Sequence, residues 1–134
     1  MRILQFAWGE QQSGDNPFPP HNHRPDSVVY TGSHDNNTTL GWWDAASENE
    51  RNHLRESLAP DGCTVNWDLI RAASASVADT AVHPMQDVMD LGAEHRMNFP
   101  GTATGNWGWR YTWAMMPPGA AARLRRFGQL YRRL

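Results

Sequence analysis

The sequence predicts an α/β fold with a parallel sheet, and the order of its apolar segments carries that prediction. Three short apolar runs, at residues 3–8, 27–31 and 80–85, have the composition of strands. Helical patterns lie between the second and third runs and again at the end of the chain. Strands separated by helices favour parallel pairing, because a parallel connection needs a crossover segment.

Each strand prediction depends on composition and on the residues that end the run. Residues 3–8 form a continuous apolar run, which is typical of a buried strand. Residues 27–31 combine β-branched and aromatic side chains and end at Gly32. The run at 80–85 contains Pro84 near its end, where a missing backbone donor costs least.

The helices are predicted from their start signals. Ser47, with Glu50 three residues later, forms a capping box for a helix that reaches about residue 58. A short helical piece precedes it at residues 40–45, and Asn66 is predicted to cap a helix over 67–75.

The second half of the chain contains two shorter predictions. A brief helix is expected around residues 86–91, and Pro118 is predicted to start a last helix that runs to residue 134. Between them, residues 92–109 are irregular and contain four glycines. Loops of this length inside compact chains are usually functional, so we expect a functional loop here.

The size of the chain limits the architecture. Three short strands cannot close a sheet, and a (β/α)8 barrel takes about 250 residues. We therefore expect residues 1–134 to be the C-terminal portion, about the last three βα units, of a TIM (β/α)8 barrel, with no separate second domain. A strand that begins almost at the first residue also suits a chain cut out of a longer one.

Composition excludes several classes of partner. The formal net charge of −2 does not suggest a nucleic acid or an anionic membrane. No apolar run approaches the ~20 residues that a membrane span needs. Cys63 is the only cysteine, so no internal disulfide can form, and a cytoplasmic location fits.

The seven tryptophans suit core packing or stacking against sugar rings.

The candidate catalytic residue is Asp35, next to His34, directly after the second predicted strand. Catalytic groups of a βα barrel lie at the C-terminal ends of its strands, where a carboxylate can face a polyol. An Asx-type turn that caps the next helix is the structural alternative. Glu10 and Asp87 follow the other two strands, and either would have to lie about 5 Å from Asp35 to complete a retaining pair.

Two further patterns have polar groups suited to ligands. His21 and His23, together with His34 and Asp35, are a possible ligand set of a barrel metallohydrolase, although His-x-His is a weak signal. Residues 94–110 mix glycines with tryptophan, arginine and asparagine side chains, which suits sugar recognition or a rigid loop packed by its own aromatics.

Five ordered blocks of the sequence resemble one family, glycoside hydrolase family 77, the 4-α-glucanotransferases. The blocks are residues 2–7 (RILQFA), 30–43 (YTGSHDNNTTLGWW), 84–92 (PMQDVMDLG), 94–102 (EHRMNFPGT) and 105–110 (GNWGWR). They follow one another in order across most of the chain, which makes the resemblance specific.

The resemblance implies a retaining double displacement on α-1,4-glucans and maltooligosaccharides, in which a sugar 4-hydroxyl is the acceptor. It assigns Asp35 as the carboxylate that stabilises the transition state, and His34 and Asn106 as substrate-binding residues. It implies no cofactor and no metal. The nucleophile and the acid/base of the family lie on earlier strands, so the chain is expected to need a missing N-terminal barrel half or self-association. A non-catalytic glucan-binding module is the alternative.

Overall fold

A computed structural model describes residues 1–9, 15–59 and 64–134, and within these ranges it has an α/β fold with a parallel sheet. The strands are β1 (Arg2–Ile3), β2 (Val28–Tyr30) and β3 (Thr80–Val82), hydrogen-bonded in the order β1-β2-β3. Both pairs are parallel. The predicted fold class is confirmed at this level. Glu10 and Cys63 lie outside the described residues.

The helices follow the predicted order, but α4 ends before the predicted residue 91 and the last helix ends at Leu130 rather than at residue 134. Between β2 and β3 lie α1 (Thr39–Ala45), α2 (Glu48–Leu58) and α3 (Val65–Ala75). After β3 come α4 (Met85–Val88) and α5 (Ala120–Leu130). The stretch between α4 and α5 is irregular apart from two 3-10 turns, at Ala93–His95 and Trp113–Met115.

One predicted cap is confirmed and one is wrong. The Ser47 hydroxyl accepts a hydrogen bond from the Glu50 N–H, and the Glu50 carboxylate accepts one from the Ser47 N–H, which is the predicted capping box. The helix assigned to Asn66 instead has Thr64 as its N-cap. Asn66 is inside that helix and fully buried, and its amide donates to Asp87 O and Asp90 Oδ1. Asn66 therefore bonds to residues that are distant in the sequence and does not cap the helix.

The first strand is shorter than predicted. It ends at Ile3, and the chain then turns through a 3-10 turn over Leu4–Phe6. This turn places the side chains of Leu4 and Trp8 in the core, where they are 0% and 2% exposed. The apolar run over residues 3–8 indicated burial correctly, but burial alone does not distinguish a strand from a tight turn.

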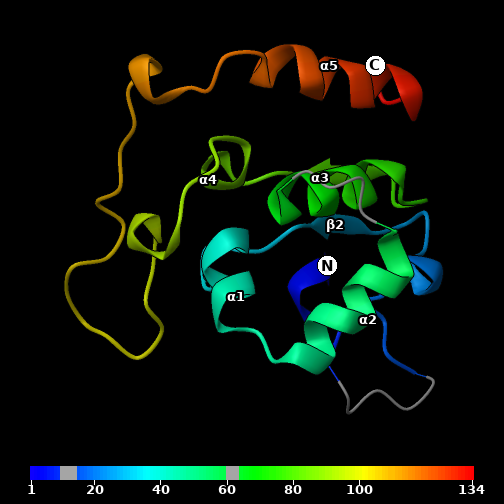
Figure 1. Cartoon of the computed structure of the whole chain (residues 1–134), viewed down its shortest axis with the longest axis horizontal. Coiled ribbons are helices and arrows are strands. Elements are labelled where there is room, and N and C mark those ends of the chain that lie inside the picture. The colour runs from blue at the N-terminus through cyan, green and yellow to red at the C-terminus, as the bar shows by residue number, and fades with distance from the viewer. Residues whose placement is uncertain (10–14, 60–63) are drawn as a thin grey trace.

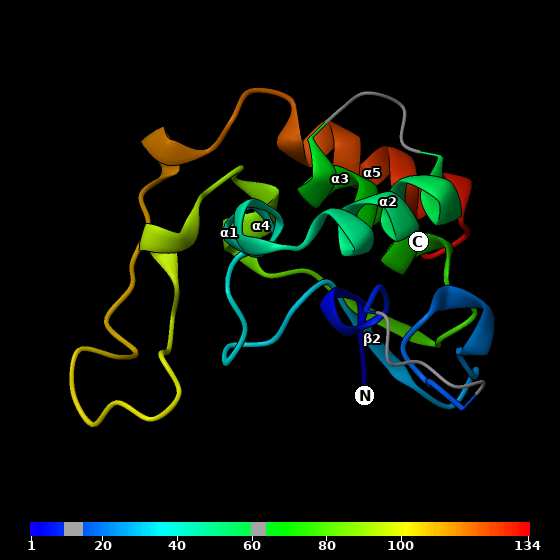
Figure 2. The ribbon, with the colours of Figure 1, turned by 60° about the horizontal axis from the view of Figure 1, so that its bottom comes forward.

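The two faces of the sheet have different surroundings. Val29 and Ala81, in register on neighbouring strands, pack into the main core against α2 and α3. Because side chains alternate along a strand, Tyr30 and Val82 lie on the opposite face. Figure 1 shows α3 between β2 and α5. Figure 2 shows α1 to α5 on the same side of the sheet.

The C-terminal helix is attached through α3. Trp67, Ile70, Val88 and Ala120 form a second buried cluster, against which side chains of α5 pack. Beyond α5, the Arg133 guanidinium donates to backbone carbonyls at the C-terminal end of α3 and just after it (Ser74, Ser76 and Ala78). Among the described residues, no helix is both long enough and apolar enough to cross a membrane.

His83, just after β3, gives the fold a pH dependence. Burial, reinforced by the Arg133 charge, lowers the pKa of His83 from 6.5 to about 4. The folded state therefore binds this proton more weakly than the unfolded chain does. The contribution of His83 to stability is complete above pH 6.5 and is lost as the pH falls from 6.5 towards 4.

We expect the free energy of unfolding to fall by about 2 kcal/mol through His83 between pH 7 and pH 4.5. Urea titrations at both pH values will measure the fall. A His83→Phe variant removes the titrating group and should reduce the difference, whereas His21→Gln, at an exposed histidine, should not. Equal pH dependence in the two variants would contradict the role of His83.

Candidate functional site

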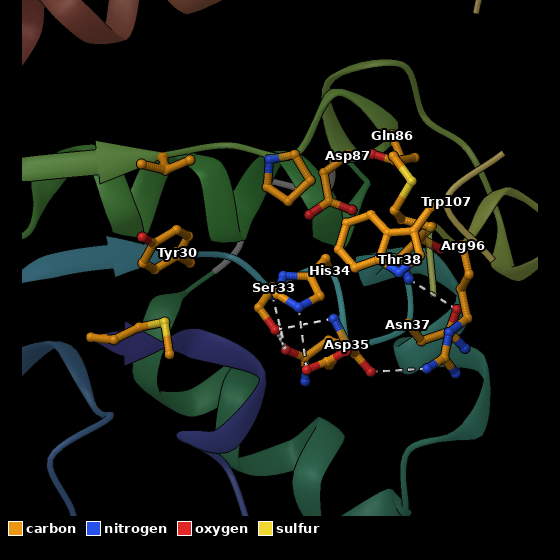
Figure 3. Close-up of a pocket in the computed structure, with 16 residues that line it drawn as sticks. Tyr30, Ser33, His34, Asp35, Asn37, Thr38, Gln86, Asp87, Arg96 and Trp107 are labelled. Atoms are coloured by element: carbon orange, nitrogen blue, oxygen red, sulfur yellow. Dashed lines mark hydrogen bonds and ion pairs between the residues drawn. The ribbon is translucent and has the colours of Figure 1, made fainter. Parts of the chain in front are cut away.

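A pocket of about 430 Å³ opens where β2 and β3 end. Tyr30 and Val82 form part of its wall at the strand ends, and the loop after β2 contributes His34 and Asp35. The irregular segment after α4 contributes Arg96 and Trp107 (Figure 3). The structure therefore places two of the three predicted site residues in one pocket at the carboxyl end of the sheet.

The His34 and Asp35 side chains lie together at this pocket and are about half exposed (54% and 56%). The Nε2 atom of His34 is 3.4 Å from the Asp35 Oδ2 atom. On its other side the His34 ring lies 4.9 Å, centroid to centroid, from Trp107. Figure 3 shows His34 between the indole and the carboxylate. A carboxylate, an imidazole and an aromatic surface are groups that hydrogen-bond sugar hydroxyls and stack on sugar rings.

The Asp35 side chain does not form the Asx-type turn and helix cap that are its structural alternative, because neighbouring residues hold the turn and cap α1. The Asn36 Oδ1 atom accepts from the Ser33 N–H at 2.9 Å and from the Ser33 hydroxyl at 2.7 Å. Thr38 provides the N-cap of α1 by accepting from the Gly41 N–H at 3.1 Å. The turn and the cap therefore leave the carboxylate of Asp35 at the pocket.

Asp87 fixes both ends of the loop that carries this pair. Its carboxylate is 1% exposed and accepts from the Thr31 hydroxyl at 2.5 Å, the Thr39 hydroxyl at 2.8 Å and the Thr39 N–H at 2.8 Å. Thr31 follows β2 and Thr39 begins α1, so Asp87 closes the loop over residues 32–38. Burial raises the pKa of Asp87, and the hydrogen bonds from Thr31 and Thr39 oppose that rise.

The hydrogen bonds of Asp87 also decide whether it can be the second catalytic carboxylate beside Asp35. Both carboxylate oxygens of Asp87 accept hydrogen bonds within the protein, so this residue has a structural role. Asp87 is therefore not suited to attack or protonate a sugar. Glu10, the other carboxylate considered, is not among the described residues.

Arg96 and Asn98 contact Asp35 from the segment after α4. The Asn98 Nδ2 atom donates to Asp35 Oδ1 at 2.7 Å, and the Arg96 Nη2 atom donates to the Asp35 carbonyl at 2.9 Å. The sequence places both residues in a candidate sugar-recognition loop but does not predict that they contact Asp35. The sequence contains no local signal for a contact between residues 61 and 63 positions apart.

Asn106, the third predicted site residue, is engaged within its own loop. Its Oδ1 atom accepts from the Phe99 N–H at 2.8 Å, and its Nδ2 atom donates to the Thr102 hydroxyl at 2.8 Å. It is not among the residues that line the pocket, although its neighbour Trp107 is. Substrate binding by Asn106 stays a prediction.

The metallohydrolase interpretation is wrong, because the structure disperses its ligands. His23 is buried, with Nδ1 2.6 Å from the Ser76 hydroxyl and Nε2 2.7 Å from the Phe18 carbonyl. Burial also lowers its pKa. His21 is exposed, and His34 lies at the strand-end pocket. Among the described residues, no three His, Cys, Asp or Glu side chains group closely enough to hold a metal.

Comparisons with known proteins agree with the resemblance seen in the sequence. A family model described as 4-alpha-glucanotransferase, of glycoside hydrolase family 77, matches residues 1–116. The chain is 48% identical over 111 residues to the chloroplastic/amyloplastic 4-alpha-glucanotransferase of Arabidopsis thaliana, with 82% of this chain covered. It is 44% identical over 142 aligned positions to the 4-alpha-glucanotransferase of Thermus thermophilus, with the whole chain covered.

A solved structure has the same fold. The amylomaltase from Streptococcus agalactiae in complex with acarbose superposes with a TM-score of 0.90 at 26% identity, over 98% of this chain and 26% of that one. The chain spans 19% of the length of the Arabidopsis relative and 28% of the Thermus relative. The relatives include both bacterial and plastid proteins, so a cytoplasmic location stays a prediction. With the family model matching most of its length, the chain belongs to the 4-α-glucanotransferases of glycoside hydrolase family 77.

Proposed function

We propose that this chain supplies part of the glucan site of a 4-α-glucanotransferase, which transfers α-1,4-glucan segments to the 4-hydroxyl of an acceptor sugar. Family membership supports the reaction class. The observation that carries the assignment is the pocket at the strand ends, where Asp35, His34 and Trp107 lie side by side. The reaction is a double displacement with retention at the anomeric carbon.

Each of these side chains has a role in that reaction. Asp35 accepts hydrogen bonds from ring hydroxyls, and its negative charge stabilises the positive charge that develops in the oxocarbenium-like transition state. His34 binds the same sugar from beside it, and Trp107 offers an aromatic face to the ring. Asn106 is the further substrate-binding residue in this proposal. No metal and no cofactor takes part.

The two remaining carboxylates come from outside this chain. A retaining mechanism needs a nucleophile and an acid/base about 5 Å apart. Among the described residues that line the pocket, the other carboxylate besides Asp35 is Asp87, and its oxygens are bonded to Thr31 and Thr39. Asp35 by itself can bind a sugar but cannot expel a leaving group. We therefore propose that residues 1–134 are inactive alone.

The missing carboxylates belong to the rest of a TIM (β/α)8 barrel, of which residues 1–134 form the C-terminal segment, about the last three βα units. The outer edge of β1 has no partner among the described residues. Such an edge pairs readily with another strand. We propose that it pairs with the preceding barrel strand, or with a second copy of the chain when that strand is absent.

Incubation with maltotriose tests the proposal. The isolated chain should bind maltotriose without turnover. A chimera in which residues 1–134 replace the matching segment of the Thermus thermophilus relative should release glucose and form longer maltooligosaccharides. Turnover by the isolated chain would contradict the need for outside carboxylates. A folded chimera without transfer, with glucan binding retained, would favour the non-catalytic binding module.

A further inference from the structure

We infer that Asn98 is a positioning residue, which holds the Asp35 carboxylate in the orientation needed for the reaction; this inference rests on the proposed function. Asn98 Nδ2 donates to Asp35 Oδ1 at 2.7 Å. The other carboxylate oxygen, Oδ2, is 3.4 Å from His34 Nε2. Each oxygen thus has a different neighbour, and together these two contacts fix the plane of the carboxylate.

Such orientation matters because Asp35 is on an exposed loop. Its side chain is 56% exposed, so packing alone does not restrict its rotation. A reacting group that moves by about 1 Å can lose about 100-fold in rate. The hydrogen bond from Asn98 supplies the restriction that packing does not, and it leaves other lone pairs of the carboxylate to accept from sugar hydroxyls.

The choice of a neutral donor is also consistent with this role. Arg96 lies beside Asp35, yet its guanidinium donates to the backbone carbonyl of Asp35 at 2.9 Å, while the neutral Asn98 donates to the carboxylate. A guanidinium paired with the carboxylate would form two strong hydrogen bonds and occupy both oxygens. An amide orients the carboxylate and leaves its negative charge available for the transition state.

Arg96 sets the distance between the two segments. Besides its bond to the Asp35 carbonyl, its Nε atom donates to the Asn98 carbonyl at 3.2 Å, so one guanidinium joins the backbones of both partners. The Phe99 ring lies 4.6 Å from the Arg96 Cζ atom and packs against the guanidinium. The same segment also brings Trp107 to His34. One irregular stretch thus arranges both members of the His34–Asp35 pair.

Variants of Asn98 in the Thermus chimera test this role in catalysis. Asn98→Ala should lower kcat by about 10- to 100-fold, with little change in KM, because a misplaced carboxylate is penalised mainly in the transition state. Asn98→Asp keeps the side-chain volume but places a negative charge beside Asp35, so its loss at pH 7 should be larger. That loss should diminish, relative to the unmodified chimera, as the pH is lowered and the new carboxyl is protonated. Asn52→Ala, at an exposed asparagine on α2, is the matched control and should retain full activity.

The outcomes separate this inference from the proposed function. An unmodified chimera without transfer would contradict the proposed function alone. An active chimera in which Asn98→Ala keeps the original kcat, or in which Asn98→Asp loses no activity, would overturn the positioning role. NMR of the isolated chain tests the contact without catalysis: the Asn98 side-chain amide protons should shift in Asp35→Ala, and unchanged resonances would also overturn the inference.

Discussion

Replacement of Asp35 by alanine in the Thermus chimera is expected to lower kcat by about 1,000-fold while KM changes by a few-fold at most. Loss of one preorganised group that stabilises transition-state charge typically costs about 100- to 1,000-fold in kcat. Asp35 is placed for such a role, at a strand-end pocket and within 3.4 Å of His34. Its bonds to the sugar strengthen as charge develops, so the loss falls on kcat. Initial rates of glucose release from maltotriose will measure both constants.

Two further variants isolate the contribution of the charge. Asp35→Asn keeps the shape and most hydrogen bonds of the side chain, so a loss close to that of Asp35→Ala would assign the effect to the negative charge. Asp26→Ala removes an exposed carboxylate that pairs with Arg24 and should leave the rate unchanged. A raised KM with an unchanged kcat in Asp35→Ala would show that Asp35 binds the ground state only, and would contradict its proposed role.

The features that the sequence predicted are those with local signals. The capping box at Ser47 and Glu50 lies within four residues, and it formed as predicted. The strand before Gly32 is apolar and β-branched, and it is β2. Because parallel strands present their carboxyl ends at one edge, the position of Asp35 after a strand was enough to predict where it would lie.

The features that the sequence did not predict depend on long-range contacts. Asn66 has the residue type and position of an N-cap, yet it is buried and bonds to residues more than 20 positions away. Asn98 and Arg96 contact Asp35 across more than 60 positions. The sequence presents Asp87 as a candidate catalytic carboxylate, and its partners in the structure are Thr31 and Thr39. No periodicity or motif encodes which distant side chains meet, because that depends on how the strands and helices pack.

Replacement of Asp87 by alanine is expected to lower the free energy of unfolding of the chain by about 3–5 kcal/mol. The carboxylate accepts three hydrogen bonds, from the Thr31 hydroxyl and from the hydroxyl and N–H of Thr39. Both threonines are 0% exposed, so water cannot replace the missing acceptor. Each buried donor left without a partner costs about 1–3 kcal/mol. In a chain of this length the loss corresponds to a fall of about 10–20 °C in Tm, which circular dichroism will measure.

The asparagine variant distinguishes hydrogen bonding from charge at this position. Asp87→Asn keeps an oxygen acceptor for the Thr39 N–H, and the threonine hydroxyls can rotate to accept from its amide. Because burial raises the pKa of Asp87, the folded state disfavours the charge, and removing that charge offsets part of the loss. We therefore expect Asp87→Asn to lower Tm by less than half as much as Asp87→Ala, and exposed Asp26→Ala to lower it by 2 °C or less (about 0.5 kcal/mol). If Asp87→Asn were as damaging as Asp87→Ala, the negative charge itself would hold the loop over residues 32–38, and the hydrogen-bond explanation would be wrong.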